Sequence, residues 1–99
     1  MNKYQPSQVQ WSIYDFDDNE INTTTLADGD YTVMQPMPND REQYYTSDKT
    51  VTVADGRIDV RACQEAVADF LNNSGDWHLF IEAAWEGPEP NTITFSLGS

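Results

Sequence analysis

Apolar and polar residues alternate along several short stretches of the chain, and a period of two predicts strands with one buried face. The first stretch is 8–16, where Val9, Trp11 and Ile13 fall on the same face. The other short strands expected in the first half lie at 21–26, 31–34, 43–46 and 50–54. Turn signals at Asp28-Gly29 and Asp55-Gly56, and a loop or bulged edge with two prolines over 35–41, separate them.

The last quarter of the chain predicts a β-hairpin. Residues 77–85 alternate, with Trp77 and Trp85 at the two ends of the apolar series and His78 on the opposite face. The segment Gly87-Pro88-Glu89-Pro90 is the expected connection, and alternation returns over 92–97. Because Trp85 is in phase with the apolar series, ordinary packing in the sheet is the favoured interpretation.

One stretch, from about Val60 to Asn72, has the period of a helix. Asp59 is a suitable N-cap, because its carboxylate can accept hydrogen bonds from first-turn amides, and Gly75 can end the helix in a left-handed conformation. The apolar stripe consists of Val60, Cys63, Val67, Phe70 and Leu71. Its position on this stripe predicts that Cys63 is a core residue and not a nucleophile.

These elements predict one α+β domain spanning residues 1–99, which suits the chain length. We expect a small antiparallel sheet of about five to six strands, with the helix (about 60–72) packed on it and a C-terminal β-hairpin. The aromatic fraction of 12% is enough to fill a core and leave some rings at the surface.

Charge restricts the choice of partner. Seventeen acidic residues against five basic ones leave a formal charge of −12. That magnitude exceeds the range of about 2–8 that keeps a small domain soluble. Such a field repels nucleic acid and anionic lipid and attracts basic surfaces. We therefore expect a basic, nucleic-acid-binding protein as partner, with no direct contact to nucleic acid or membrane. In a salt-loving organism the same acidity would carry no functional meaning.

The expected compartment is the cytoplasm, of a host cell if the chain is phage-encoded. The first ten residues are polar, without the apolar segment of a signal peptide, and no apolar run approaches the length of a membrane span. Cys63 is the single cysteine, so no internal disulfide can form.

No motif for catalysis or cofactor binding is present: there is no phosphate-binding loop, no dinucleotide glycine pattern, no paired-cysteine zinc spacing and no HExxH. His78 has no partner that the sequence identifies, so we predict neither an enzyme nor a cofactor. If the protein were an enzyme instead, a pair of carboxylates such as Glu82 and Glu86 would act as general acid and base.

The acids that follow the first strand match the start of a calcium loop. Asp15-x-Asp17-x-Asn19 supplies the first ligands, but Glu20 replaces the glycine of the sharp turn and Leu26 replaces the bidentate glutamate. No metal site is predicted there.

Rows of carboxylates can imitate a phosphate backbone. Alternate residues of a strand lie about 6.7 Å apart on one face, close to twice the roughly 3.4 Å rise per phosphate of duplex DNA. Adjacent tyrosines of an extended segment face opposite sides, so at least one should be exposed as an interface anchor. The predicted partner-binding residues are Asp15, Asp17, Asp18, Glu20, Asp28, Asp30, Asp40, Glu42, Tyr44 and Tyr45.

The leading hypothesis is a non-enzymatic inhibitor that covers the basic, nucleic-acid-binding surface of a target protein, with mimicry of DNA as one form of it. Anti-CRISPR proteins, anti-restriction proteins and nuclease-inhibiting immunity proteins share this profile of small size, acidity and absence of motifs. The likeness is one of composition only. The alternative is a small structural or assembly protein that uses strand edges and aromatic surface.

Overall fold

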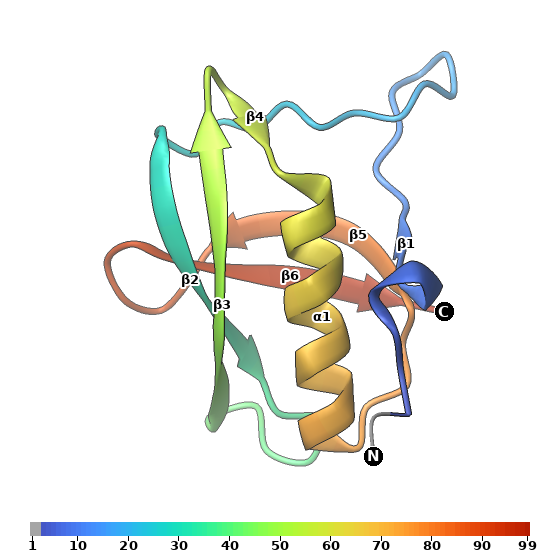
Figure 1. Cartoon of the computed structure of the whole chain (residues 1–99), viewed down its shortest axis with the longest axis vertical. Helices are drawn as coiled ribbons and strands as arrows, with labels where there is room; N and C mark the ends of the chain where they lie inside the picture. Colours follow the sequence, from blue (N-terminus) through green and yellow to red (C-terminus); the bar gives the residue numbers. More distant parts are fainter. Residues whose placement is uncertain (1–2) are drawn as a thin grey trace.

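A single helix packs on a curled sheet of six strands in the computed structural model, which describes residues 3–99 (Figure 1). The strand order is β1-β5-β6-β2-β3-β4. The elements in chain order are the 3₁₀ turn η1 (Pro6–Gln8), β1 (Gln10–Trp11), β2 (Gly29–Pro36), β3 (Tyr44–Ala54), β4 (Arg57–Ile58), α1 (Val60–Ser74), β5 (Phe80–Glu86) and β6 (Thr92–Gly98).

The α+β class and the C-terminal strand pair are confirmed, but the sheet is mixed and not purely antiparallel. β1 runs parallel to β5, and β6 runs parallel to β2. The cause is the path of α1, which carries the chain away from β4 and β3 so that the hairpin of β5 and β6 joins the sheet along the free side of β2. Local alternation predicts strands but carries no information on this order.

The helix forms where the apolar stripe predicts it and ends two residues later, at Ser74. The Asp59 carboxylate accepts a hydrogen bond from the Ala62 amide at the N-terminus, and Gly75 follows the last turn with a left-handed φ of 79°. Cys63 is fully buried in the core. Burial, and then the negative charge of Asp59, raises the pKa of its thiol, so the reactive thiolate is disfavoured. No helix in the described part of the chain is long and apolar enough to cross a membrane.

β3 is one strand of 11 residues where the sequence predicts two short ones. Between them lies Ser47, which is as buried as the valines farther along the strand, so the inward positions of the strand are not all apolar. Its hydroxyl donates a hydrogen bond of 2.7 Å to Asp69 of α1, which makes burial of a serine tolerable. A period-two search of apolar residues misses such a position.

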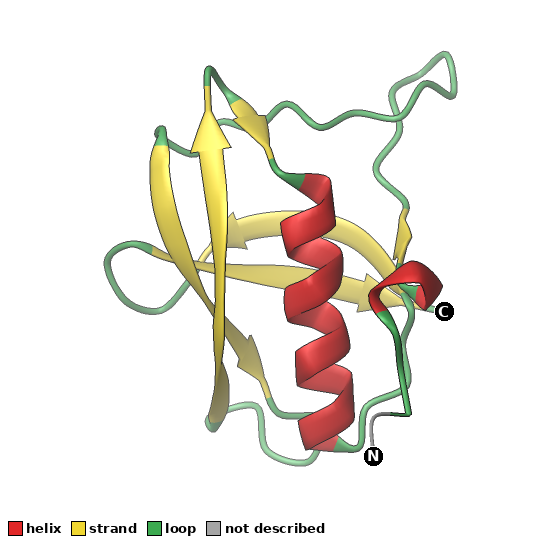
Figure 2. Ribbon diagram, in the orientation of Figure 1, coloured by secondary structure: helices red, strands yellow, loops and turns green. Residues whose placement is uncertain are grey.

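The two strands predicted over 8–16 and 21–26 are largely absent. Only Gln10–Trp11 forms a strand in the first range, and residues 21–26 form an irregular segment that we call the strap. The strap runs from β1 to β4, the two edges of the sheet (Figure 2). Its Ile21 amide donates to the Ile13 carbonyl, and its Asn22 carbonyl accepts from the Ile58 amide. The strap therefore joins both edges without becoming a strand of the sheet.

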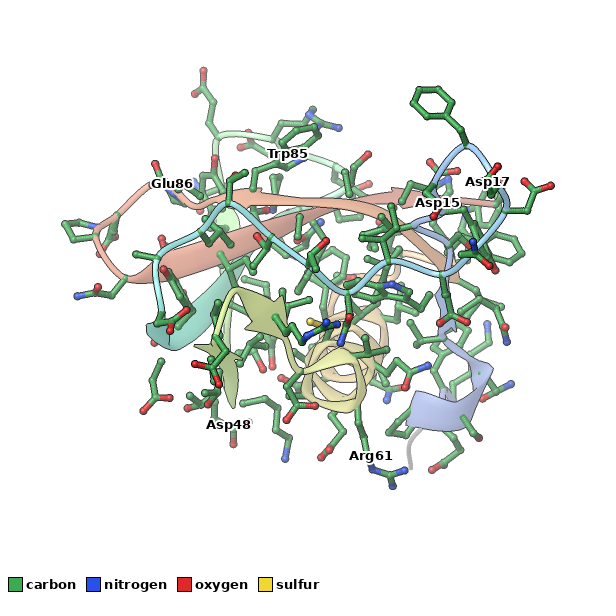
Figure 3. All side chains as sticks on the ribbon, turned by 90° about the horizontal axis from the view of Figure 1, so that it is seen from above. Asp15, Asp17, Asp48, Arg61, Trp85 and Glu86 are labelled. Atoms are coloured by element: carbon green, nitrogen blue, oxygen red, sulfur yellow. The ribbon has the colours of Figure 1, made fainter. Side chains whose placement is uncertain are left out.

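A bulge in β5 overturns the expected packing of Trp85. The pairing of β5 with β6 shifts register between Ile81 and Ala83. The shift inverts the alternation, so Ile81 is buried, Ala84 packs against the core and Trp85 is 56% exposed. Trp85 accordingly lies on the side of β5 away from the helix (Figure 3).

Candidate functional site

The most prominent surface feature is a short acidic loop that projects beside β1. Residues 14–20, the acidic loop from here on, leave the sheet after β1 and return at a bridge between Tyr14 and Glu20. Asp15 and Asp17 lie at its outer end (Figure 3). Phe16, between them in the sequence, is fully exposed, the most exposed large apolar side chain of the described residues.

Internal hydrogen bonds hold the acidic loop in one shape. The Asp15 carboxylate accepts hydrogen bonds from the backbone amides of Asp17, at 2.8 Å, and Asn19, at 2.9 Å. The hydrogen bond from the Asn19 amide lowers the pKa of Asp15; desolvation opposes this effect, and the Asp17 amide and the Asn19 side chain add to it. Asp18 adopts a left-handed φ of 61°, which completes the turn. The loop is therefore preorganised, and Phe16 is presented from a fixed backbone.

Four of the predicted partner-binding acids come together on this loop, but their roles differ. Asp15 directs its carboxylate at the amides of its own loop. Within residues 3–99, the side chains of Asp17, Asp18 and Glu20 make neither a hydrogen bond nor an ion pair. These three carboxylates follow Phe16 in the sequence and remain available to an external cation.

A second group of predicted acids stabilises the turn between β3 and β4. The two carboxylate oxygens of Asp28 accept hydrogen bonds from the backbone amides of Asp55 and Gly56, at 2.9 and 3.0 Å. Asp30 on β2 accepts a hydrogen bond of 2.7 Å from the Thr52 hydroxyl on β3. Both carboxylates therefore have a structural role, and no binding partner is needed to account for their presence.

The third group lies at the opposite end of β2 and β3. Asp40 accepts a hydrogen bond from the Glu42 amide within the loop between these strands. Tyr44 is exposed, as expected of at least one of the two tyrosines. Tyr45 instead donates a hydrogen bond of 3.0 Å to Asp69 and packs against Phe70 of the helix. Burial, and then the bond to Asp69, raises the pKa of Tyr45.

The ten predicted residues therefore occupy three separate places and not one row. The eight residues of β2 separate Asp28 from the loop that holds Asp40. At about 3.3 Å per residue the two ends of the strand lie more than 20 Å apart. A continuous strip of carboxylates over all three groups does not form, and of these three places the acidic loop is the one where several free carboxylates and an exposed aromatic ring coincide.

Sequence reasoning also missed a partner of His78. The ring does not project from a strand but lies before β5, where its Nδ1 is 2.6 Å from the Asp76 carboxylate. The same oxygen accepts hydrogen bonds from the backbone amides of Trp77 and His78, and the Trp77 ring stacks on the imidazole at 4.1 Å between centroids. Burial opposes ionisation of Asp76, but the donors from His78 and Trp77 outweigh it and lower its pKa. The spacing Asp-x-His is the signal that would have found this local turn.

Phe16 is the functional candidate that the sequence reasoning overlooked. The detectable signal was an aromatic residue inside a run of acids, in a segment with turn composition and with no apolar residue adjacent to it. Among residues 3–99 no group of three or more His, Cys, Asp or Glu side chains is arranged to hold a metal ion. Comparison of the chain with models of protein families, with curated protein sequences and with solved structures gave no match.

Proposed function

We propose that this protein is a non-enzymatic inhibitor that binds a basic, nucleic-acid-binding surface of a target protein through the acidic loop. The observation that carries the proposal is the full exposure of Phe16 on a loop where it is followed by three free carboxylates. An anti-CRISPR, anti-restriction or nuclease-inhibiting activity is the form that such binding would take. Its target would be a protein of the cytoplasm that itself binds nucleic acid.

The two components of the acidic loop suit different parts of the binding event. Phe16 would enter an apolar pocket, and complete burial of such a ring contributes about 2–3 kcal/mol. Asp17, Asp18 and Glu20 would face Lys and Arg side chains at the rim of that pocket. Exposed pairs contribute little to affinity, but they accelerate association and select a basic partner. The charge of −12 extends that steering beyond the loop.

The rigidity of the loop favours this mode of binding. Because Asp15 already holds the turn, the partner does not have to order it, and the entropy lost on association is smaller. Nucleic acid would be excluded by occupancy of its site and by charge repulsion. This mode of binding does not require a row of carboxylates spaced like phosphates. The predicted acids lie in three separate places and do not form such a row.

The first test is capture of binding proteins from lysates of candidate host cells, washed at low and then at high salt. A nucleic-acid-binding protein that is retained at low salt and released by high salt is the expected result. The purified partner is then titrated with wild type and with Phe16→Ala, for which we expect an affinity loss of about tenfold or more. Trp85→Ala is the matched control, because it removes an exposed aromatic ring elsewhere.

Charge reversal tests the contribution of the three carboxylates separately from that of Phe16. Asp17→Lys, Asp18→Lys and Glu20→Lys combined should slow association and weaken its dependence on salt. Unchanged affinity in both this variant and Phe16→Ala would refute the acidic loop as the binding site. Recovery of the protein itself as a salt-resistant oligomer would favour a structural or assembly role instead.

A further inference from the structure

One side of β5 is without a strand partner over most of its length. β6 pairs with β5 from Phe80 to Glu86, but β1 pairs with the opposite side only at Phe80 and Ile81. After the Ser12 amide donates to the Ile81 carbonyl, no backbone hydrogen bond within residues 3–99 reaches this side of residues 82–86. The unpaired backbone of an edge strand is a template for another strand.

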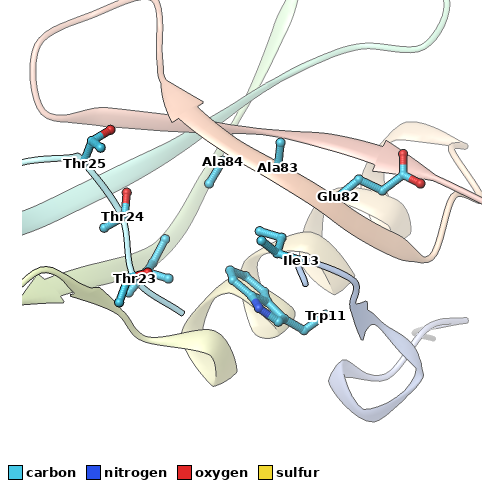
Figure 4. A pocket seen from close by; sticks show the side chains of 9 residues that line it. Trp11, Ile13, Thr23, Thr24, Thr25, Glu82, Ala83 and Ala84 are labelled. Carbon is cyan, nitrogen blue, oxygen red and sulfur yellow. The ribbon is translucent and has the colours of Figure 1, made fainter. Parts of the chain in front are cut away.

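The unpaired side of β5 opens into a groove. The cavity has a volume of about 500 Å³ and lies between β5 and the strap (Figure 4). Ala83 and Ala84 line it on β5, and Thr23, Thr24 and Thr25 line it on the strap. Apolar side chains also line it, and Figure 4 shows Trp11 and Ile13 across the groove from Ala83 and Ala84.

We infer that this groove binds an extended segment of a partner protein, which adds to β5 as a strand in the position that β1 leaves empty. Two observations support it: the backbone of β5 is unpaired on this side, and the groove beside it has room for an added strand. One residue of a paired strand fills roughly 160 Å³, from a rise of about 3.4 Å, a strand spacing of about 4.8 Å and a depth of about 10 Å. The groove therefore accommodates about three residues.

The lining specifies the kind of segment. Ala83 and Ala84 are small and leave room on the two faces of β5 for side chains of the incoming strand, and the apolar lining favours Val, Ile or Thr there. Glu82 and Glu86 are exposed on β5 at either end of the unpaired stretch. A Lys or Arg flanking the apolar residues would face one of them. The threonine hydroxyls of the strap offer hydrogen bonds to the second edge of the added strand.

The inference does not depend on the proposed function. The acidic loop lies outside the groove lining, so loss of Phe16 would leave strand addition unaffected. Conversely, a filled groove would leave the acidic loop intact. Variants at the two places distinguish failure of one proposal from failure of the other.

The test begins with selection from a display library of random seven-residue peptides on the wild-type protein. We expect enrichment of peptides with alternating β-branched residues and a flanking Lys or Arg. Within residues 82–86, the amides that point to the unpaired side should then become protected from hydrogen exchange when a selected peptide is added. N-methylation of alternate peptide amides on the bonding side should weaken binding by about tenfold or more, because the ladder loses its donors.

Ala84→Phe fills the groove and should abolish binding of the selected peptides. Ala54→Phe is the control, since Ala54 is an exposed strand residue elsewhere. Thr25→Trp, which blocks the groove from the exposed strap, replaces Ala84→Phe should that variant fail to fold. The inference is overturned by absence of any enriched peptide, by equal binding to the filled and control variants, or by indifference to N-methylation.

Discussion

The side-chain amide of Gln35 forms hydrogen bonds with both backbone groups of Phe95. Its Oε1 accepts from the Phe95 amide at 2.9 Å, and its Nε2 donates to the Phe95 carbonyl at 2.7 Å. β2 and β6 pair directly only at Thr32 with Thr92 and at Val33 with Ile93. Where these parallel strands separate, the glutamine takes the place of a peptide group and satisfies a backbone that would otherwise be buried without partners.

Replacement of Gln35 by Leu should therefore be costly. It leaves the amide and carbonyl of Phe95 unsatisfied in the interior, at about 1–3 kcal/mol for each group. We expect a loss of about 2–6 kcal/mol in the free energy of unfolding, measured by urea denaturation. Gln43→Leu, in the exposed loop between β2 and β3, is the control and should change stability by less than about 0.5 kcal/mol. Equal stability of the two variants would contradict this role of Gln35.

The hydrogen bonds of Asp69 connect α1 to β3. One carboxylate oxygen accepts from both the Tyr45 and the Ser47 hydroxyls, at 3.0 and 2.7 Å. Asp69→Ala leaves the buried Ser47 without this acceptor and should lower the free energy of unfolding by about 2 kcal/mol. Asp48→Ala, at an exposed position on the same sheet, should have little effect. Thermal unfolding of both variants checks the difference.

Alkaline pH should weaken the contact between Tyr45 and Asp69. The pKa of Tyr45 is raised in the folded state, so its contribution to stability is complete below the usual value of 10.0. That contribution is lost as the pH rises from there through the higher folded pKa. We expect Tyr45→Phe to show a shallower fall of stability above about pH 10 than wild type. Tyr44→Phe, at the exposed neighbour, should follow wild type.

Acid should weaken the turn before β5. The pKa of Asp76 is lowered in the folded state, so its contribution is complete above the usual value of 3.8 and is lost as the pH falls through the lower folded pKa. Asp76→Asn should therefore reduce the loss of stability below that pH, while lowering stability near neutrality. Urea titrations at several pH values test this. A pH profile identical to wild type would show that Asp76 does not contribute to acid unfolding.

Asp28 and the acidic loop should respond in opposite ways to removal of charge. Asp28→Ala removes both acceptors of the turn between β3 and β4 and should destabilise the protein by about 1 kcal/mol, without changing partner affinity. Neutralising Asp17 and Asp18 to Asn should weaken partner binding without loss of stability. A loss of affinity in Asp28→Ala as large as in the loop variant would extend the binding site to that turn.

Prediction of the candidate site from sequence was partial for a physical reason. The run Asp15–Glu20 identifies a charged turn without knowledge of the fold, because its residues are neighbours in the chain. Whether Asp28 and Asp40 join that turn depends on strand order and length. The exposure of Phe16 likewise depends on which elements surround the loop. The sequence shows only that no apolar neighbour is adjacent.

Elements whose causes are local could be predicted from the amino-acid order alone. Helix α1 follows from an apolar stripe, the Asp59 cap and Gly75, all within one continuous segment. Three features became visible only in the folded chain: the parallel placement of β6 beside β2, the bulge that exposes Trp85, and the strap that leaves β5 unpaired. These depend on contacts between residues far apart in the chain. Alternation specifies which side chains share a face of a strand, but neighbouring strands determine which face is buried and which edge stays open.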